Sequence, residues 1–245
     1  PPFDDVRVRQ AFAYAIDWKE INDKAYLGLD VPGITDTPPL SWAFDPSVRP
    51  YPYEPAMAKQ LLEAAGWRPG PDGSLMKDGK PFAVDITTVI GNTTRLEAEE
   101  LIQAQLRQIG VDVEVHNYPA NLLFATGSQG VLFSGRFDLA LYGWSEDPDP
   151  DDIATLSPAS IPPGGVNYTF YADPDIARWQ LLGESRYERS ERLPYYWDIQ
   201  ERIHAAVPFH TINWQSHIDA VNTDLENFRP APAIADFWNA YQWKI

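Results

Sequence analysis

The sequence predicts an α/β fold, because strand-like and helix-like patterns alternate along its middle third. Residues 82–90 and 111–118 alternate apolar and polar side chains and are rich in β-branched residues, so both are predicted strands. Between them, residues 94–109 carry apolar side chains at helical spacing. Strand, helix and strand at this spacing predict a βαβ unit with parallel pairing. Residues 137–144 alternate again and predict a further strand.

The N-terminal third begins with a predicted helix and continues as a loop. Asp4 and Asp5 precede residues 6–16, whose apolar side chains recur at helical spacing, so an N-capped amphipathic helix is expected. Residues 32–53 are rich in proline and aromatic residues. Because proline fits neither a helix interior nor a central strand, this segment is expected to be a stiff, extended loop packed by its own aromatic side chains.

Three more helices and a hairpin complete the pattern. Residues 54–65 begin with Glu-Pro and predict a short helix that Gly66 ends. Two Asp-Gly pairs within residues 70–80 predict a hairpin or paired turns. Residues 175–185 and 190–206 predict two helices towards the C-terminus.

The composition excludes several classes of function. Of 245 residues, 35 are acidic and 19 basic, and the net charge of −16 would repel nucleic acid. The absence of cysteine excludes disulfides, thiolate catalysis and zinc–sulfur sites. No apolar run is long enough to predict a membrane span. Hydrophobic residues make up 44%, which suits one large domain or two small ones. The start PPFDDVRVRQ, without methionine, indicates a mature fragment or a trimmed chain.

Motifs for metals, cofactors and nucleophiles are not found in the sequence. The four histidines, His116, His204, His210 and His217, form no HExxH pair and have no spacing that places two ligands on one helical face. His116 and His204 are expected to be structural. The sequence has neither a Gly-x-Ser-x-Gly elbow nor a glycine-rich phosphate loop. We therefore expect no metal, no cofactor and no catalytic activity.

The segment GWSEDPDPDD, residues 143–152, is the strongest candidate for a site and allows four interpretations. As an EF-hand loop starting at Asp147, it has Asp152 where glycine is required and Pro158 where a bidentate glutamate is required. A catalytic carboxylate pair normally comes from different strand ends, which one clustered loop does not provide. A solvated turn is the simplest interpretation, because Asp-Pro pairs are ordinary turn formers. The fourth interpretation is a loop that anchors a ligand.

The position of this segment favours ligand anchoring. It follows a predicted strand, and open α/β folds bind ligands at the carboxyl ends of their strands. Trp144 can wall a pocket, while Pro148 and Pro150 stiffen the loop and lower the entropic cost of holding Asp147 in place. A fixed carboxylate beside an aromatic wall suits a cationic head group. A loop cap that bonds nearby backbone amides is the alternative role for Asp147, and the last three aspartates are expected to serve turn formation and solvation.

Five motifs together resemble a known family. They appear in the order PPFDDVRVRQAFAYAID, PYPYEPAMAKQLLEAAGW, LIQAQLRQIGVDVEV, FDLALYGWSEDPDPDD and NYTFYADPDI. The set resembles the C-terminal lobe of family 5 extracellular solute-binding proteins, the dipeptide, oligopeptide and nickel-type receptors of ABC importers. The resemblance implies a periplasmic-binding-protein-like α/β lobe of type II (cluster C-like), with a mixed sheet and flanking helices. Residues 1–215 would form the C-terminal ligand-binding lobe, and residues 216–245 a tail that packs on an N-terminal lobe absent from this chain.

The resemblance also implies roles for individual residues. In peptide-binding members, the aspartate shortly after the Gly-Trp pair binds the α-amino group of the peptide, and Asp147 is the matching residue here. Gly143 and Trp144 would line the same pocket. Asn167 and Thr169, in the stretch that matches the asparagine-rich segment of the family, are further candidates for ligand contact.

The implied function is the substrate-binding component of an ABC importer, which captures peptides outside the cytoplasmic membrane and delivers them to permease subunits. The protein would be periplasmic or at the cell surface, lipid-anchored at full length, and not an enzyme. Some oligopeptide receptors hold the peptide carboxylate with an arginine just before the Gly-Trp pair, whereas this chain has Leu141 and Tyr142 there. The alternatives are an oligosaccharide receptor, a glycoside hydrolase that uses Glu146 and Asp147, and an interaction module without a small ligand.

Overall fold

The computed structural model describes residues 2–231 and 236–245. Its helices are α1 (Val6–Ala15), α2 (Trp18–Ala25), α3 (Pro55–Ala64), α4 (Thr93–Gln108), α5 (Ala120–Leu123), α6 (Ile153–Leu156), α7 (Pro174–Glu184) and α8 (Arg189–Ala206). Its strands are β1 (Val31–Pro32), β2 (Arg68–Pro69), β3 (Leu75–Lys77), β4 (Lys80–Pro81), β5 (Ala83–Thr87), β6 (Asp112–Val115), β7 (Leu139–Ala140) and β8 (Asn213–Trp214). The predicted α/β class is confirmed.

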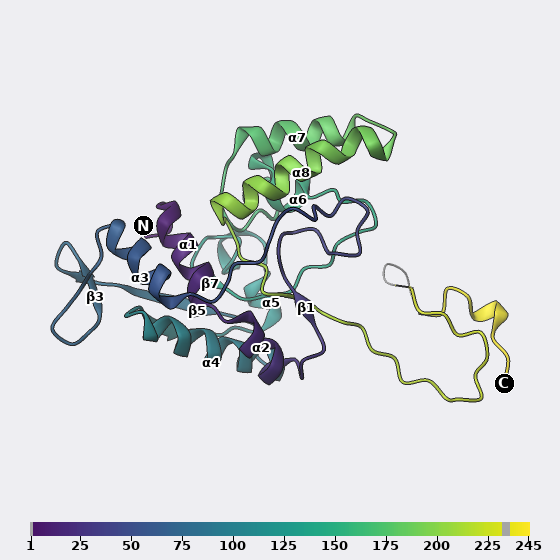
Figure 1. Cartoon of the computed structure of the whole chain (residues 1–245), viewed down its shortest axis with the longest axis horizontal. Helices are drawn as coiled ribbons and strands as arrows, with labels where there is room; N and C mark the ends of the chain where they lie inside the picture. Colours follow the sequence, from purple (N-terminus) through teal and green to yellow (C-terminus); the bar gives the residue numbers. More distant parts are fainter. Residues whose placement is uncertain (1, 232–235) are drawn as a thin grey trace.

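A parallel sheet with the order β6-β5-β7 positions the candidate site (Figure 1). Ile86 of β5 pairs with Val115 of β6 on one side and with Leu139 of β7 on the other. Because α4 connects β5 to β6, the predicted βαβ unit is confirmed. β7 is shorter than the alternating segment 137–144, since the chain after it makes one further bond, from the Leu141 amide to the Thr87 carbonyl oxygen, and then leaves the sheet. A parallel bridge between Val89 and Tyr118 extends the pairing of β5 and β6.

Two smaller sheets are antiparallel. β2, β3 and β4 form a meander, and Asp78 and Gly79 in its second turn adopt positive φ angles of 51° and 75°. β1 pairs with β8 across a long sequence separation. A Cβ atom on Gly33 would lie 2.2 Å from the Thr211 carbonyl oxygen, so glycine is required for these segments to approach. Parallel and antiparallel pairing therefore both occur, in separate sheets of the described residues.

The predicted signals for helix ends are confirmed in α1 and α3. The Asp5 carboxylate caps α1 by accepting a 2.9 Å bond from the Arg7 amide. α3 carries Pro55 in its first turn and is followed by Gly66, which has a positive φ of 96°.

α2 is a helix that the sequence analysis does not predict. Asp17 caps it by accepting 3.1 Å bonds from the amides of Lys19 and Glu20. Ion pairs at i,i+4 spacing join Lys19 to Asp23 and Glu20 to Lys24, at 2.7 and 2.6 Å. The Asp-x-x-Glu pattern is a capping signal that could have indicated this helix.

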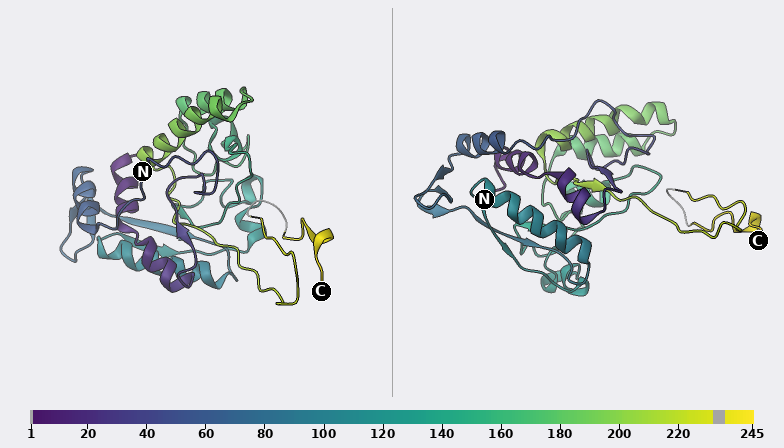
Figure 2. Two further views of the ribbon diagram at one scale, coloured as in Figure 1. Left: turned by 45° about the vertical axis from the view of Figure 1, so that its right-hand side comes forward. Right: turned by 60° about the horizontal axis from the view of Figure 1, so that its bottom comes forward.

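The main core lies between the parallel sheet and helices α1, α3 and α4 (Figures 1 and 2). Its buried side chains include Phe12, Leu62, Ile86, Ile102 and Leu106. α7 and α8 pack on each other over a second core, which contains Ile176 and Ile199. Leu139 and Leu141 pack against the main core and Leu156 belongs to the second, so the two cores flank the segment that follows β7.

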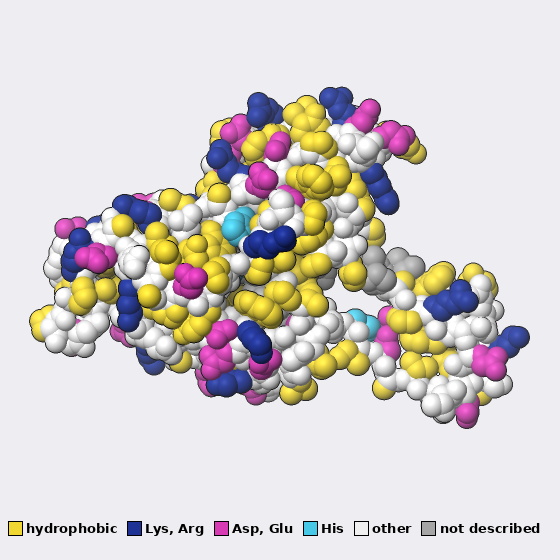
Figure 3. All heavy atoms as spheres, in the orientation of Figure 1, with side chains coloured by type: hydrophobic (Ala, Val, Ile, Leu, Met, Phe, Trp, Pro, Cys, Tyr) yellow, Lys and Arg dark blue, Asp and Glu magenta, His cyan; other side chains and the backbone are white. Residues whose placement is uncertain are grey.

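The C-terminal segment leaves the body of the molecule after β8 (Figures 1 and 2). Ser216 ties its start to the body through a 2.6 Å bond from its Oγ to the Leu29 carbonyl oxygen. Figure 3 shows hydrophobic side chains over this segment, and the large exposed ones among the described residues are Ile218, Val221, Phe237, Trp238, Tyr241 and Ile245. Residues 232–235 of the predicted tail lie outside the described residues. In the part of the chain that is described, we find no helix of the length and apolarity needed to cross a membrane.

Candidate ligand-binding site

The carboxyl ends of β5 and β7 lie where the order of the parallel strands reverses. The chain runs from β5 through α4 to β6 on one side, whereas β7 lies on the other side of β5. Open α/β sheets bind ligands at the carboxyl ends of strands near such a reversal. The segment that leaves β7 at this edge, residues 141–152, is called the 141–152 loop below.

Arg95 lies beside Gly143 of this loop. Asn92 caps α4 and accepts a 2.9 Å bond from the Arg95 amide, so the arginine belongs to the first turn of the helix. A Cβ atom on Gly143 would lie 3.3 Å from Arg95 Nη2, so the glycine leaves space for the guanidinium. Within residues 2–231 and 236–245 the Arg95 guanidinium forms no ion pair. The sequence analysis missed Arg95, although its position just after a strand and at a helix start was a usable signal.

Trp144 and Asp147 both face solvent. The Trp144 side chain is 48% exposed. The Asp147 carboxylate is exposed, and among the described residues it neither accepts a hydrogen bond nor forms an ion pair. A loop cap would bond backbone amides, so this geometry disfavours the cap interpretation and leaves the carboxylate available to a ligand.

Asp149 ties the loop to α8. Arg192 donates to its carboxylate from Nη1 at 2.8 Å and from Nη2 at 2.6 Å. The guanidinium also lies 5.3 Å from the centroid of the Trp42 ring. Such a bidentate pair restricts both partners, so Asp149, whose side chain is 56% exposed, anchors the loop in addition to the turn formation and solvation expected of it.

Asp151 and Asp152 precede α6 and differ in their surroundings. Asp151 Oδ1 accepts a 2.9 Å bond from the Ile153 amide, which is the expected turn chemistry. Asp152 is 5% exposed and accepts a 2.8 Å bond from Gln180 Nε2 of α7. The expected solvated role of Asp152 is therefore wrong. Burial, followed by the charge of Asp36, raises the pKa of Asp152 well above its usual range.

Glu146 and Asp36 add two more carboxyl groups to this region. Burial, followed by the charges of Asp152, Asp147 and Asp151, raises the pKa of Glu146 to about 7. Burial also raises the pKa of Asp36 to about 6, although a hydrogen bond with Asp152 acts in the opposite direction. Desolvated carboxyl groups without a cation hold protons near neutral pH.

Asn167 and Thr169 hold a neighbouring turn together. Asn167 is fully buried, and its Nδ2 donates 3.1 Å bonds to the carbonyl oxygens of Leu156, Ser157 and Tyr171. Its Oδ1 accepts a 2.6 Å bond from Thr169 Oγ1, which in turn accepts a 3.1 Å bond from the Tyr171 amide. The chain itself uses the Asn167 amide, so this geometry disfavours direct ligand contact by Asn167, while the contact expected of Thr169 stays a prediction. Both residues position the backbone near α6.

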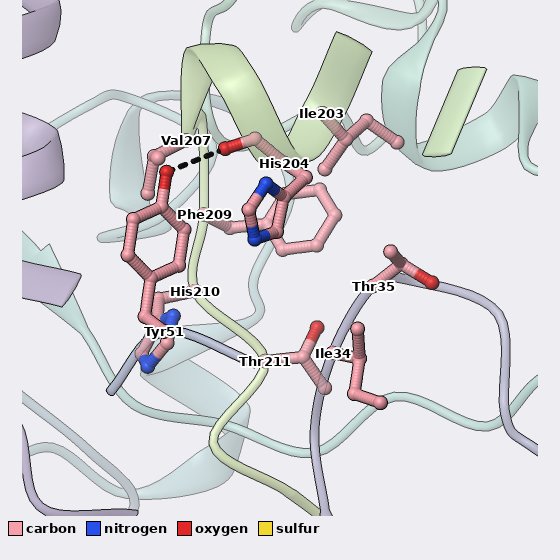
Figure 4. A pocket seen from close by; sticks show the side chains of 9 residues that line it. All are labelled: Ile34, Thr35, Tyr51, Ile203, His204, Val207, Phe209, His210 and Thr211. Atoms are coloured by element: carbon pink, nitrogen blue, oxygen red, sulfur yellow. Dashed lines mark hydrogen bonds between the residues drawn. The ribbon is translucent and has the colours of Figure 1, made fainter. Parts of the chain in front are cut away.

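The small pocket beside α8 is too small for a ligand (Figure 4). Tyr51, His204 and His210 are among its lining residues, and its volume is about 10 Å³. Such a volume holds about one water molecule at most. Burial lowers the pKa of His204 and lowers that of His210 to about 4. Tyr51 stacks on His204 with ring centroids 4.5 Å apart, which supports the structural role expected of His204.

One group of residues in the described chain could hold a metal ion. Ligand atoms of His217, Asp219 and Asp236 lie within 4.8 Å of one another. His217 Nε2 is 3.1 Å from a carboxylate oxygen of each aspartate. The charge of Asp236, followed by the hydrogen bond with Asp219, raises the pKa of His217. Ion pairing with a protonated imidazole therefore accounts for this arrangement without a metal.

The sequence matches a family and several characterised relatives. The model for bacterial extracellular solute-binding proteins, family 5 middle region, matches residues 1–164. The chain is 28% identical to the oligopeptide-binding protein AppA of Bacillus subtilis, over 98% of this chain and 44% of the relative. It is 31% identical to the glutathione-binding protein GsiB of Pectobacterium atrosepticum, over 94% of this chain and 43% of the relative. The chain thus spans less than half the length of these relatives.

Solved structures match the fold over nearly the whole chain. The oligopeptide-binding protein AppA from Bacillus subtilis, in complex with a nonapeptide, superimposes with a TM-score of 0.85 at 27% identity, over 99% of this chain and 48% of that one. NikZ from Campylobacter jejuni, in complex with Ni(L-His), superimposes with a TM-score of 0.81 at 25% identity, over 99% of this chain and 49% of that one.

Proposed function

The chain belongs to family 5 of the bacterial extracellular solute-binding proteins, and from this premise we propose that it is the ligand-binding lobe of a receptor for short peptides. The receptor would capture a peptide in the periplasm or at the cell surface and deliver it to an ABC permease, without catalysing a reaction. One observation carries the proposal. The Asp147 carboxylate is exposed and unengaged by the described residues, and the exposed Trp144 precedes it at the carboxyl edge of the parallel sheet.

The Asp147 carboxylate is proposed to bind the α-amino group of the peptide. An α-amino group has a pKa near 8, so it is largely protonated at neutral pH and donates charge-assisted hydrogen bonds to a carboxylate. The Trp144 indole would form one wall, and Gly143 would allow the ligand backbone to approach. The relatives named for oligopeptides and for glutathione support a ligand of this class.

Arg95 is proposed to bind the carboxylate end of the same ligand. No cationic residue stands directly before Gly143, where the sequence has Leu141 and Tyr142. The Arg95 guanidinium reaches the neighbourhood of Gly143 from the start of α4, without an ion pair to any described residue. A guanidinium binds a carboxylate with two parallel hydrogen bonds. A cation and an anion on one wall suit a zwitterion as short as a dipeptide.

A second lobe is proposed to complete the site. Residues 1–215 would form one wall of the cleft, and residues 216–245 would pack on the partner lobe. The exposed hydrophobic side chains of the C-terminal segment support this role, because a soluble chain gains by covering them. Closure of the two lobes around the ligand would then create the surface that the permease recognises.

An oligosaccharide is the second candidate ligand, because the 48% exposed side chain of Trp144 offers a face on which a pyranose can stack. Glycoside hydrolysis is not proposed. Glu146 and Asp147 are consecutive in one loop, whereas hydrolases flank the scissile bond with two opposed carboxyl groups.

The experiment is a titration of the ¹⁵N-labelled chain, followed by NMR, with unblocked dipeptides, the same dipeptides N-acetylated, maltotriose and Ni(L-His). This titration detects millimolar binding by a single lobe, which corresponds to a binding free energy of roughly −4 kcal/mol. We expect shifts of the Trp144 indole and Asp147 amide signals with unblocked dipeptides only. Shifts with maltotriose instead would favour a sugar receptor, and shifts that survive N-acetylation would contradict the role of Asp147.

A further inference from the structure

A hydrogen-bonded network joins the carboxyl ends of the three parallel strands. Thr88, Asn117 and Leu141 follow β5, β6 and β7 in turn. The Thr88 amide donates a 2.7 Å bond to Asn117 Oδ1, and Thr88 Oγ1 donates a 2.6 Å bond to the Leu141 carbonyl oxygen. Because Thr88 is fully buried, water does not compete for these bonds. One residue therefore connects the ends of all three strands.

The same network reaches α4. Asn117 Nδ2 donates a 2.6 Å bond to Glu99 Oε2, and Glu99 is 2% exposed. The other Glu99 oxygen is buried without a partner among the described residues, so this carboxylate depends on the Asn117 donor. Glu99 lies four residues after Arg95, on the same face of α4. The network therefore holds the helical turn that follows Arg95. Its members, Thr88, Glu99, Asn117 and Leu141, are called the Thr88 network below.

The Thr88 network also holds the start of the 141–152 loop. The Leu141 amide donates a 2.9 Å bond to the Thr87 carbonyl oxygen, while the Leu141 carbonyl oxygen accepts from Thr88. Both polar groups of this backbone unit are thus bonded to the end of β5. Further along, the bidentate pair with Arg192 holds the loop to α8. Asp147 therefore lies between two anchored points of the chain.

We propose that the Thr88 network is a positioning network, which fixes the distance between Arg95 and Asp147 and so determines the length of peptide that the lobe binds. This inference rests on the proposed function, in which these two residues bind opposite ends of a zwitterion. Each added residue lengthens an extended peptide by up to about 3.6 Å. Hydrogen bonds do not tolerate such a change in distance, so a fixed spacing favours one length over its neighbours. The network acts through Arg95 and the loop, without contacting the ligand.

Thr87 and Thr88 provide matched variants for a test without ligand. Both side chains are fully buried, but Thr87 Oγ1 has no partner among the described residues, whereas Thr88 Oγ1 bonds Leu141. Valine has nearly the shape of threonine and lacks the hydroxyl. Hydrogen exchange at the Leu141 amide should therefore rise roughly ten-fold in Thr88→Val and stay unchanged in Thr87→Val. Thr88→Ser, which keeps the hydroxyl, should exchange as the wild type.

Asn117→Ala tests whether the network acts as a unit. Asn117 is half-buried and bonds Thr88 and Glu99 but not Leu141, so a local effect would expose only the Thr88 amide. We expect exchange at the Leu141 amide to rise as well, roughly five-fold. Unchanged exchange at Leu141 in either Thr88→Val or Asn117→Ala would overturn the proposal, so the second variant gives an answer even if the first does not fold.

NMR titration with unblocked dialanine, trialanine and tetraalanine measures the length preference. In the wild type one length should bind at least roughly five-fold more tightly than the other two, the factor that one lost hydrogen bond accounts for. In Thr88→Val the three affinities should lie within roughly two-fold of one another, because the spacing is no longer fixed. Thr87→Val should keep the wild-type preference. The corresponding peptide amides, which have no carboxylate, should show no preference in any of these proteins.

Three results would contradict one of the two proposals. Peptide binding without a length preference in the wild type would overturn the positioning role. A preference that survives in Thr88→Val, with all lengths weakened equally, would also overturn it, because that result indicates a stabilising role alone. Absence of binding of any alanine peptide, with the exchange difference between Thr88→Val and Thr87→Val intact, would contradict the proposed function and leave the Thr88 network supported as the anchor of the loop.

Discussion

At the scale of single residues, three aspartates of one loop differ in what surrounds them. Asp147 faces solvent without a partner in the described chain, Asp149 is held by Arg192, and Asp152 is buried against Gln180. The side chains are chemically identical, so the nearby donors determine what each one does. Only the aspartate without a donor keeps its carboxylate available to a ligand.

Arg95→Gln should weaken dipeptide binding by about 1.5–3 kcal/mol, because it removes a charged hydrogen-bonding partner of the ligand carboxylate. The matched control is Arg107→Gln at the opposite end of α4, which should leave the affinity unchanged. NMR titration or calorimetry gives both affinities. Dipeptide amides, which have no carboxylate, should bind the wild type and Arg95→Gln equally, and an equal loss for amides and free acids would contradict this role.

Asn167→Ala should lower the free energy of unfolding by about 2–4 kcal/mol, because it leaves buried carbonyl oxygens without a donor. The side chain is fully buried and donates to three carbonyl oxygens at 3.1 Å. Urea unfolding measures the change. Thr169→Val removes one hydroxyl from the same network and should lower the free energy of unfolding by less than Asn167→Ala does. A variant as stable as the wild type, with ligand binding lost, would show that Asn167 contacts the ligand after all.

Glu146→Gln should raise the melting temperature at pH 8 more than at pH 5. The pKa of Glu146 is raised to about 7 in the native state, so the native protein binds this proton more tightly than the unfolded chain does. The associated stability is present at low pH and is lost as the pH rises through 7. Gln stays neutral and avoids that loss. Glu97→Gln, an exposed site on α4, is the control for general charge effects, and a gain in melting temperature that does not depend on pH would contradict the assignment.

The sequence predicted the solvent-facing part of the candidate site better than its buried part. The position of Asp147 after a strand and the turn chemistry of Asp151 follow from local spacing, and the structure has both features. The partners of Asp149 and Asp152 come from α8 and α7, far along the chain, so no local pattern could indicate them. Arg95 stands just after a strand and at a helix start, which is a local signal, but only the folded sheet shows that it lies beside Gly143.

At the scale of elements, the βαβ unit is the part of the fold that the sequence predicts most directly. α4 ends within a residue of the predicted helix, because its apolar spacing and its C-terminal glycine are both local signals. β7 came out shorter than predicted, since alternation in residues 137–144 continues beyond the last residue that pairs with β5. A parallel bridge between Val89 and Tyr118, in contrast, extends the pairing of β5 and β6 almost to the predicted ends. The pairing of β1 with β8 was not predicted, because it depends on a close approach of distant segments at Gly33.

Leu106→Ala should destabilise the chain by about 2–5 kcal/mol, because it opens a cavity between α4 and the parallel sheet. Leu106 is fully buried in the main core. The control is Leu181→Ala in α7. Because the Leu181 side chain is 64% exposed, this substitution should leave the free energy of unfolding nearly unchanged. Urea unfolding of both variants measures the difference. Equal costs for the two substitutions would contradict the assignment of the core.

At the scale of the whole molecule, the chain has a well-packed body and a C-terminal segment with exposed apolar side chains. The body carries the candidate site at one edge of its sheet, whereas the segment contributes none of the residues proposed to contact the ligand. A two-lobed receptor accounts for both features, because the lobe that closes over the site can also cover the segment. In the proposed receptor the ligand would bridge the two lobes, and Asp147 would be the charged contact on this lobe.

The central claim, that Asp147 binds the α-amino group of a peptide, is tested most directly by calorimetry or NMR titration of Asp147→Asn. The substitution keeps the shape of the side chain and removes its charge, so unblocked dipeptides should bind at least ten-fold more weakly, a loss of about 1.4 kcal/mol or more. Asp151→Asn, in the same loop, should bind as the wild type. Unchanged affinity in Asp147→Asn, or an equal loss in Asp151→Asn, would contradict the claim.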